Sequence, residues 1–268
     1  MRGSECIFKY LQLVASSKTS KNLVLSRVSF WMLEMQDASS RFYTFPEEIC
    51  KYVHLEGLNL SGNYLLTVPP AISNLTNLRQ LDLEQNRLRR LPTEMCLCVS
   101  LEHIMLLRNP DLKVPSREVT TKGSAAVIQF LKCLYTAEHT NSVALNDSGY
   151  RRIPIELLKY WNLTSLSVAR NAVEILPAEI ADMVSLTELD LDDNQLAMLP
   201  EELCDLLSLT SLGIANNLLV ALPDDMSRLV NLVEVRSHGN FLVGNSSIQT
   251  QTFLSPGPTP HFFVPSNF

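Results

Sequence analysis

Acidic side chains gather at two places along the chain, with spacings that could support chemistry. The denser cluster consists of Glu188, Asp190, Asp192 and Asp193, and a smaller one consists of Asp82 and Glu84. Alternate residues of a β-strand point to the same side, so carboxylates two residues apart would share one face. Such a face could grip lysine or arginine side chains of a partner protein. It could also hold a hard cation such as calcium, but neither a glycine turn nor EF-hand spacing accompanies these aspartates, and we favour the protein partner.

Three further acidic pairs, Glu47–Glu48, Glu201–Glu202 and Asp224–Asp225, each follow a proline. Paired carboxylates can act as general acid and base, but these pairs recur at one place in a repeated pattern, where the start of a helical turn favours negative charge. The sequence also lacks a phosphate-cradling Gly-Lys-Ser/Thr loop, a Gly-x-Ser-x-Gly elbow, a His-Glu-x-x-His helix and paired zinc cysteines. We therefore expect a protein that is not an enzyme and that binds no cofactor or metal.

The acidic clusters belong to a pattern that repeats every 23 residues and is clearest from Leu186 to Leu209. With Leu186 as position 0, leucines fall at positions 3, 5, 10, 13, 17 and 20, asparagine at position 8 and proline at position 14. Clear units also begin at Leu55, Leu78, Leu101, Thr140, Leu163, Leu209 and Leu232. Each unit is expected to form a short strand, a turn built on asparagine and a return segment.

This pattern resembles the leucine-rich repeat. The Leu-Pro dipeptide followed by an acidic pair is similar to the intracellular 23-residue class found in Ras-pathway scaffolds and plant intracellular Ras-group-related proteins. The resemblance covers residues 32–242. It implies an α/β solenoid, namely a leucine-rich repeat horseshoe with a parallel concave sheet and about nine repeats. It also implies a role in intracellular signalling, with a small GTPase or a kinase-pathway component as the partner.

The repeated positions have distinct physical roles in such a solenoid. Residues at positions 3 and 5 would point inward and stack into hydrophobic ladders, so we expect one buried row formed by Leu58, Leu81, Leu166, Leu189 and Leu212. Asparagine at position 8 carries both a donor and an acceptor that can satisfy backbone groups left unpaired by the turn. The asparagines are therefore predicted to be structural: Asn63, Asn86, Asn109, Asn171, Asn194, Asn217 and Asn240.

The period divides the chain into four segments. These are residues 1–31 before the repeats, a first sub-array at 32–139, a second sub-array at 140–242, and a flexible tail at 243–268. Residues 1–31 are basic and hold six serines. They are either an N-terminal cap, in which Leu23, Val24 and Leu25 add a strand, or a basic leader of the transit-peptide type.

Sixteen extra residues interrupt the period after the unit at Leu101. Within residues 121–136, Val127, Leu131 and Leu134 recur at helical spacing, which predicts one inserted amphipathic helix. This helix either closes the first sub-array or loops out of one continuous solenoid.

The charge is unevenly distributed. The chain has a formal net charge of -6, and residues 1–31 hold five Lys and Arg against one Glu, while residues 243–268 hold no charged side chain, so residues 32–242 carry -10 by difference. This acidic surface argues against nucleic acid as a partner and favours a basic protein surface.

The chain shows no sign of membrane insertion or export. No apolar run reaches the roughly 18 to 20 residues of a membrane helix. Cys50, Cys96 and Cys204 share position 18 of separate repeats, where a disulfide between them would span too far, so free thiols in the reducing cytoplasm are expected.

A partner would bind the concave face, which exposes positions 2, 4 and 6, with positions 7 and 9 along the rim. Met105 and Leu107 are predicted to be exposed apolar residues there, while small residues such as Gly213 and Ala215 would let a partner approach closely. The predicted protein-binding residues are Asp82, Glu84, Arg87, Met105, Leu107, Arg108, Arg170, Glu188, Asp190, Asp192 and Asp193.

These observations favour a non-enzymatic, cytoplasmic scaffold that binds a protein partner with a basic patch. Nucleic acid and membrane are not expected as partners. The alternative is the sensing or targeting region of a larger or multi-subunit enzyme, such as a phosphatase, a ubiquitin ligase or an immune-type receptor.

Overall fold

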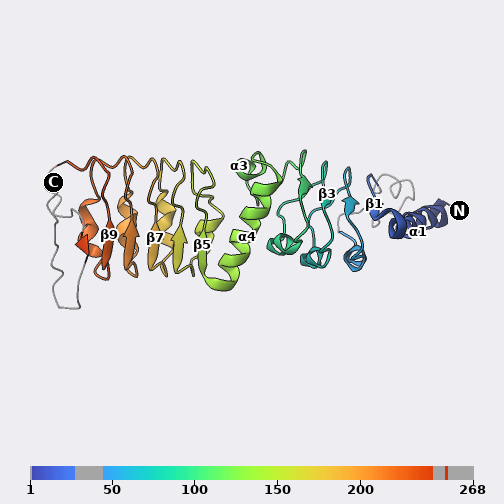
Figure 1. Ribbon diagram of the computed structural model, residues 1–268, viewed down its shortest axis with the longest axis horizontal. Helices are drawn as coiled ribbons and strands as arrows, with labels where there is room; N and C mark the ends of the chain where they lie inside the picture. Colours follow the sequence, from blue (N-terminus) through green and yellow to red (C-terminus); the bar gives the residue numbers. More distant parts are fainter. Residues whose placement is uncertain (1, 28–44, 244–250, 253–268) are drawn as a thin grey trace. The chain divides into compact units, whose positions relative to one another are not determined.

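Residues 2–27, 45–243 and 251–252 are described in a computed structural model of the protein (Figure 1). The chain divides into two compact units, residues 1–135 and residues 136–268. Within each unit the same coil recurs: a three-residue strand, a turn, an extended stretch and a short 3-10 helix.

Four parallel strands form the sheet of the first unit, in the order β1-β2-β3-β4. Their bounds are Asn22–Val24 (β1), Gly57–Asn59 (β2), Gln80–Asp82 (β3) and His103–Met105 (β4). The register places Leu23 beside Leu58, Leu58 beside Leu81 and Leu81 beside Ile104. All four side chains are buried, because position 3 points away from solvent in every coil.

Five parallel strands and one short antiparallel strand form the sheet of the second unit. They are Ser142–Ala144 (β5), Ser165–Ser167 (β6), Glu188–Asp190 (β7), Ser211–Gly213 (β8), Glu234–Arg236 (β9) and Gln251–Thr252 (β10). Leu166, Leu189 and Leu212 are paired in register and buried. The parallel strands of the leucine-rich repeat fold are thus confirmed. The single predicted row of leucines is instead two rows, one in each sheet.

The antiparallel strand β10 was not predicted, because it lies in the segment expected to be a flexible tail. It pairs with β9 through Gln251 beside Val235 and Thr252 beside Glu234.

The return segments are 3-10 helices that follow the regularly spaced prolines of the repeat. They are Glu47–Lys51 (η2), Pro70–Asn74 (η3), Thr93–Leu97 (η4), Leu157–Lys159 (η5), Ala178–Asp182 (η6), Glu201–Asp205 (η7) and Asp224–Arg228 (η8). Pro200 immediately precedes η7 with an extended backbone, a place where its missing N–H removes no intrahelical bond. The acidic pair Glu201–Glu202 lies in the first turn of η7, as the pattern predicts.

The position-8 asparagines have the predicted structural role. The Asn194 Nδ2 group donates to the carbonyls of Val168 and Leu191, both at 3.0 Å, and its Oδ1 accepts the Val173 N–H at 3.0 Å. One side chain therefore ties its own coil to the coil before it.

Within the described residues, three α-helices accompany the coils: Arg2–Ser20 (α1), Arg117–Thr120 (α3) and Ser124–Thr140 (α4). The helix predicted for residues 121–136 is α4, shifted toward the C-terminus. Helix α4 begins after Gly123, whose φ is 99°, and ends before Asn141, whose φ is 54°. Both values lie in the left-handed region, which interrupts a right-handed helix. None of the helices in the described part of the chain is long and apolar enough to cross a membrane.

The strand beside β2 is β1, which follows α1 directly, and Lys21 between them has a φ of 58°. The first residues of the sub-array predicted for 32–139, up to residue 44, lie outside the described residues. The same sequence of helix, left-handed residue and strand thus begins each sheet, at Lys21 and at Asn141.

Candidate protein-interaction surface

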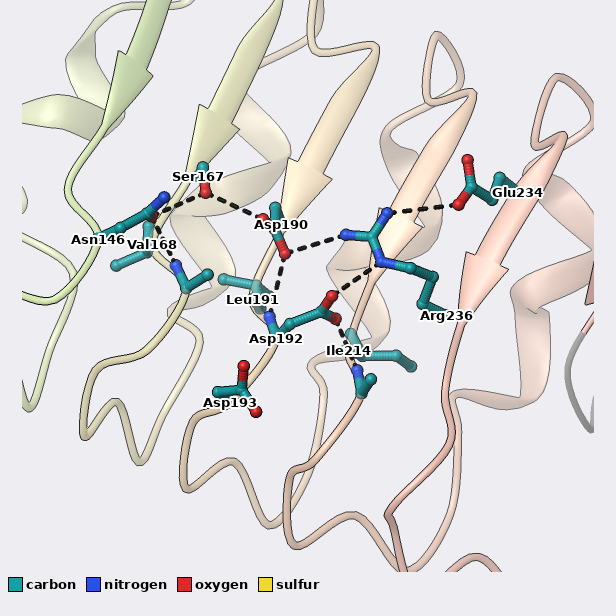
Figure 2. A network of polar contacts seen from close by, with 12 residues as sticks. Asn146, Ser167, Val168, Asp190, Leu191, Asp192, Asp193, Ile214, Glu234 and Arg236 are labelled. Atoms are coloured by element: carbon teal, nitrogen blue, oxygen red, sulfur yellow. Dashed lines mark hydrogen bonds and ion pairs between the residues drawn. The ribbon is translucent and has the colours of Figure 1, made fainter.

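Arg236 is the centre of a polar network on the exposed strand face of the second unit (Figure 2). Its side chain comes from the end of β9 and reaches β7. The Nη2 atom lies 3.1 Å from Asp190 Oδ1, the Nε atom 2.8 Å from Asp192 Oδ2, and the Nη1 atom 3.4 Å from Glu234 Oε1. The sequence indicated no basic partner for the acidic cluster that contains Asp190 and Asp192. In the structure, Arg236 partly neutralises that cluster.

Gly213 makes this crossing possible. It lies on β8, between β7 and β9, and a Cβ atom there would collide with the Arg236 guanidinium and would lie 2.7 Å from Asp190 Oδ1 and 2.8 Å from Asp192 Oδ1. The expectation that Gly213 opens the surface to a partner is wrong, because the Arg236 side chain occupies that space.

Hydrogen bonds extend the network toward β6. The Ser167 hydroxyl lies 2.8 Å from Asn146 Oδ1 and 3.0 Å from Asp190 Oδ2, and its single proton can serve only one acceptor at a time. Asp192 Oδ1 accepts the Ala215 N–H at 2.7 Å. Asp190 and Asp192 are thus held by the sheet and are only partly available to a partner.

The electrostatics of Arg236 follow from its two carboxylate partners. Partial burial lowers the pKa of the guanidinium, but the hydrogen bond to Asp192 and the charges of Asp192 and Asp190 outweigh it, so the net pKa is raised. Arg236 therefore stays charged and pairs with both aspartates.

Glu188 and Asp193 are the two carboxylates of the same coil that form no ion pair with Arg236. Both are exposed, and neither forms an ion pair with any residue in the described part of the chain. Asp193 has a φ of 55° and accepts a hydrogen bond from Asn216 Nδ2 at 2.7 Å. Of the four acidic residues predicted for this cluster, these two could pair with lysine or arginine side chains of another protein.

Arg170 lies at position 7 of the preceding coil and points along the rim. Its Nε atom lies 2.8 Å from Asp147 Oδ1, and both side chains are exposed. The hydrogen bond from Arg170 lowers the pKa of the Asp147 carboxyl. Since both residues occupy position 7 of neighbouring coils, adjacent position-7 side chains can form an ion pair.

The predicted site residues of the first unit fall into two groups. Asp82 accepts bonds from Asn59 Nδ2 at 2.9 Å and from the Glu84 N–H at 3.0 Å. The Arg87 guanidinium lies 5.4 Å from the centroid of the Tyr64 ring, a cation–π distance.

The other group lines a cavity of about 660 Å³ between β4 and the segment that carries α3 and the start of α4. Glu84, Met105, Leu107 and Arg108 contribute to its wall. Met105 is 37% exposed and Leu107 is 72% exposed, so the prediction that these two apolar side chains face solvent is confirmed.

The acidic excess belongs to the second unit alone. Residues 136–268 hold sixteen Asp and Glu against six Lys and Arg, whereas residues 1–135 hold twelve Asp and Glu against sixteen Lys and Arg. A partner with a basic patch therefore matches the second unit, and the first unit would favour a different kind of partner.

Sequence reasoning did not predict the polar network formed by Arg236, Ser167 and Asn146, although Ser167 and Asn146 were expected on this face as small residues. A signal was present, because Ser167, Asp190, Gly213 and Arg236 all occupy position 4 of consecutive coils. Gly213 separates Asp190 from Arg236 at this position, and its missing side chain leaves room for the Arg236 side chain to cross.

The described residues hold no group of three or more His, Cys, Asp and Glu that could bind a metal ion. The following cysteines are free thiols: Cys50, Cys96, Cys98, Cys133 and Cys204. Burial raises the pKa of Cys98 to about 12 and that of Cys133 to about 11, which disfavours the nucleophilic thiolate.

Two segments of the chain match family patterns described as leucine rich repeats, at residues 53–110 and residues 185–206. Among curated proteins, the chain is similar to the leucine-rich repeat and calponin homology domain-containing protein 1 of Mus musculus, with 37% identity over 75 residues. It is also similar to the probable inactive serine/threonine-protein kinase roco10 of Dictyostelium discoideum, with 25% identity over 169 residues.

The aligned parts are small fractions of those relatives. The first alignment covers 28% of this chain and 10% of the mouse protein. The second covers 63% of this chain and 6% of the Dictyostelium protein.

Solved structures with similar features include a leucine-rich repeat protein of Leptospira interrogans, with 26% identity and a TM-score of 0.39 over 76% of this chain and 54% of that chain. An internalin of Listeria monocytogenes has 21% identity and a TM-score of 0.36 over 74% of this chain and 52% of that one. Both TM-scores are low, and neither likeness bears on what this chain binds.

Proposed function

Because the chain has the leucine-rich repeat fold, we propose that it is a non-enzymatic scaffold that binds a protein partner on the exposed strand face of its second unit. Leucine-rich repeats typically serve protein interaction. The observation that carries the proposal is the pair of exposed carboxylates, Glu188 and Asp193, on a coil whose other two aspartates are fixed by Arg236.

The partner fits this face if it presents lysine or arginine side chains. Glu188 and Asp193 flank the network held by Arg236, so a basic surface would gain two ion pairs without disturbing the bonds inside the sheet. We propose a small GTPase or a kinase-pathway component with a basic surface as the partner, and the cytoplasm as the place of binding.

Affinity capture from a cell lysate tests this proposal. The test variant, Glu188→Gln with Asp193→Asn, removes two charges, and asparagine tolerates the left-handed backbone at 193. The control variant, Glu201→Gln with Glu202→Gln, removes two charges from η7, away from the strand face. Capture of one protein that falls with the test variant and with rising salt, but not with the control, supports the proposal. Equal capture by all three chains would contradict it.

A second candidate function is a targeting region within a larger protein. The matched curated relatives favour it, since the similar part forms only 10% and 6% of their length. Immunoblotting of the endogenous protein with an antibody against the repeats distinguishes the two, because a product near 30.1 kDa would contradict the larger protein.

A further inference from the structure

The last strand of the first sheet has an unpaired edge. Within each sheet, the N–H groups at positions 5 and 7 of one coil donate to the carbonyls at positions 4 and 6 of the next coil. In the coil before β4, the Leu83 N–H donates to the Met105 carbonyl and the Gln85 N–H donates to the Leu107 carbonyl, both at 2.9 Å.

On β4 itself, the side chain of Ser124 replaces the missing neighbour at one position only. The Ile104 N–H donates to Ser124 Oγ at 3.0 Å, and that hydroxyl lies 3.3 Å from the Ile104 carbonyl. By the same alternation, the N–H groups of Leu106 and Arg108 point away from β3. The structure records no acceptor for either group among the residues it describes, and both residues line the cavity.

The wall behind these two donors is apolar. Leu106 is only partly buried, whereas leucines at the same position of other coils, such as Leu83 and Leu191, are fully buried. Leu112 and Val127 also line the cavity of about 660 Å³, so an inward-pointing apolar side chain on an added strand would have a hydrophobic surface to cover.

Two arginines and one carboxylate, Glu84, line the cavity, which leaves a net positive charge. Arg108 and Arg117 both line it and are exposed, and neither forms an ion pair within the described part of the chain. Arg108 occupies position 7, and the pair formed by Arg170 and Asp147 at 2.8 Å shows that position-7 side chains of adjacent coils meet. A carboxylate at position 7 of an added strand would therefore meet Arg108.

We propose that this edge binds an extended segment of a partner protein as a parallel fifth strand. Two carbonyls of the segment, two residues apart, accept the Leu106 and Arg108 N–H groups. The residue between those carbonyls is apolar and enters the cavity. A carboxylate on the residue after the second carbonyl pairs with Arg108. This surface differs in unit and in charge from the face proposed above, so either proposal can fail without the other.

A synthetic peptide tests the proposal directly. The fluorescein-labelled sequence Ser-Val-Ala-Leu-Asn-Asp, which copies residues 142–147 of this chain as a model strand, has the required order of an apolar residue, one intervening residue and a carboxylate. A matched peptide ends in Lys instead of Asp. We expect the 268-residue chain to bind the first peptide in an anisotropy titration, and the amides of Leu106 and Arg108 to exchange more slowly with solvent in the complex. Absence of binding, or binding that leaves both amides unprotected, would overturn the proposal.

Variants of Arg108 test the charge that the proposal requires. Arg108→Asn keeps a residue that tolerates the φ of 59° and should weaken binding about tenfold. Arg89→Gln, a change in the coil before β4 at a residue outside the cavity wall, should leave binding unchanged. Arg108→Asp should prefer the Lys-ended peptide. Equal affinity of the wild type, Arg108→Asn and Arg108→Asp proteins for the Asp-ended peptide would contradict the assigned ion pair.

Discussion

Arg236 lies over Gly213, and this contact lets one guanidinium join two aspartates of a coil two strands away. The arrangement shows why a list of charged residues misjudges the strand face. Asp190 and Asp192 are held by Arg236 at 3.1 and 2.8 Å, so the carboxylates that remain for a partner are at the edges of the cluster.

Gly213→Ala should destabilise the protein, because its new methyl group would displace Arg236 and the two carboxylates. Urea denaturation should show a loss of about 1 to 3 kcal/mol in the free energy of unfolding. In the Arg236→Met background, part of that clash is gone. The same change should then lower the free energy of unfolding by at least about 0.5 kcal/mol less than it does in the wild type. Equal costs in both backgrounds would mean that Arg236 does not occupy the space over Gly213.

Leu191→Ala should leave a cavity in the core of the second unit. Leu191 is fully buried, and such truncations cost about 2 to 5 kcal/mol. Leu207→Ala is the control, since Leu207 is 52% exposed and its loss should cost no more than about 0.5 kcal/mol. Similar melting temperatures for the two variants would show that the assigned register is wrong.

Asn194→Ala should remove two hydrogen bonds that tie its coil to the preceding coil and two bonds within its own coil. Because the backbone groups of Val168, Leu191 and Val173 would lose a buried partner, we expect a loss of at least about 2 kcal/mol. Asn231→Ala removes one exposed bond, from Nδ2 to the Leu207 carbonyl at 2.8 Å, and serves as the control. Denaturation midpoints of the two variants are measured side by side. A similar small change for both variants would contradict the structural role of Asn194.

The Cys98 thiol should make stability depend on pH in the alkaline range. Burial raises its pKa from 9.0 to about 12, so the unfolded chain releases this proton before the native protein does. The contribution to stability is therefore complete below pH 9 and is lost as the pH rises from 9 toward 12. Relative to Cys98→Ala, the wild type should lose up to about 1.4 kcal/mol per pH unit above 9. A constant difference between the two proteins across this range would contradict a buried neutral thiol.

The sequence predicts the coil well, because the coil depends on local spacing. Positions 3, 5 and 8 face the same surroundings in every unit, so Leu189 and Asn194 could be assigned before any coordinates. Features that join distant coils were harder to predict. The reach of Arg236 depends on the missing side chain of Gly213 and on the distance across three strands, neither of which a 23-residue period encodes.

The ends of the sheets were also difficult to predict, since they break the repeat. β1 precedes β2 by more than one period, and the sequence between them does not repeat, so Leu23 could be offered only as one strand residue of a cap. The cavity beside β4 arises because Ser124 accepts a hydrogen bond only from the Ile104 N–H. A full neighbouring coil would also accept bonds from the N–H groups of Leu106 and Arg108. The 23-residue period predicts the regular coils, but it does not predict the structures that take the place of a coil at the ends of the sheets.

Hydrogen–deuterium exchange on the complex captured through the second unit tests the central claim most directly. If a basic partner binds the exposed strand face, amides should gain protection in segments 188–193 and 211–216, while the 3-10 helices at 178–182 and 201–205 exchange as in the free protein. Protection confined to those helices, with the strand segments unchanged, would contradict the account.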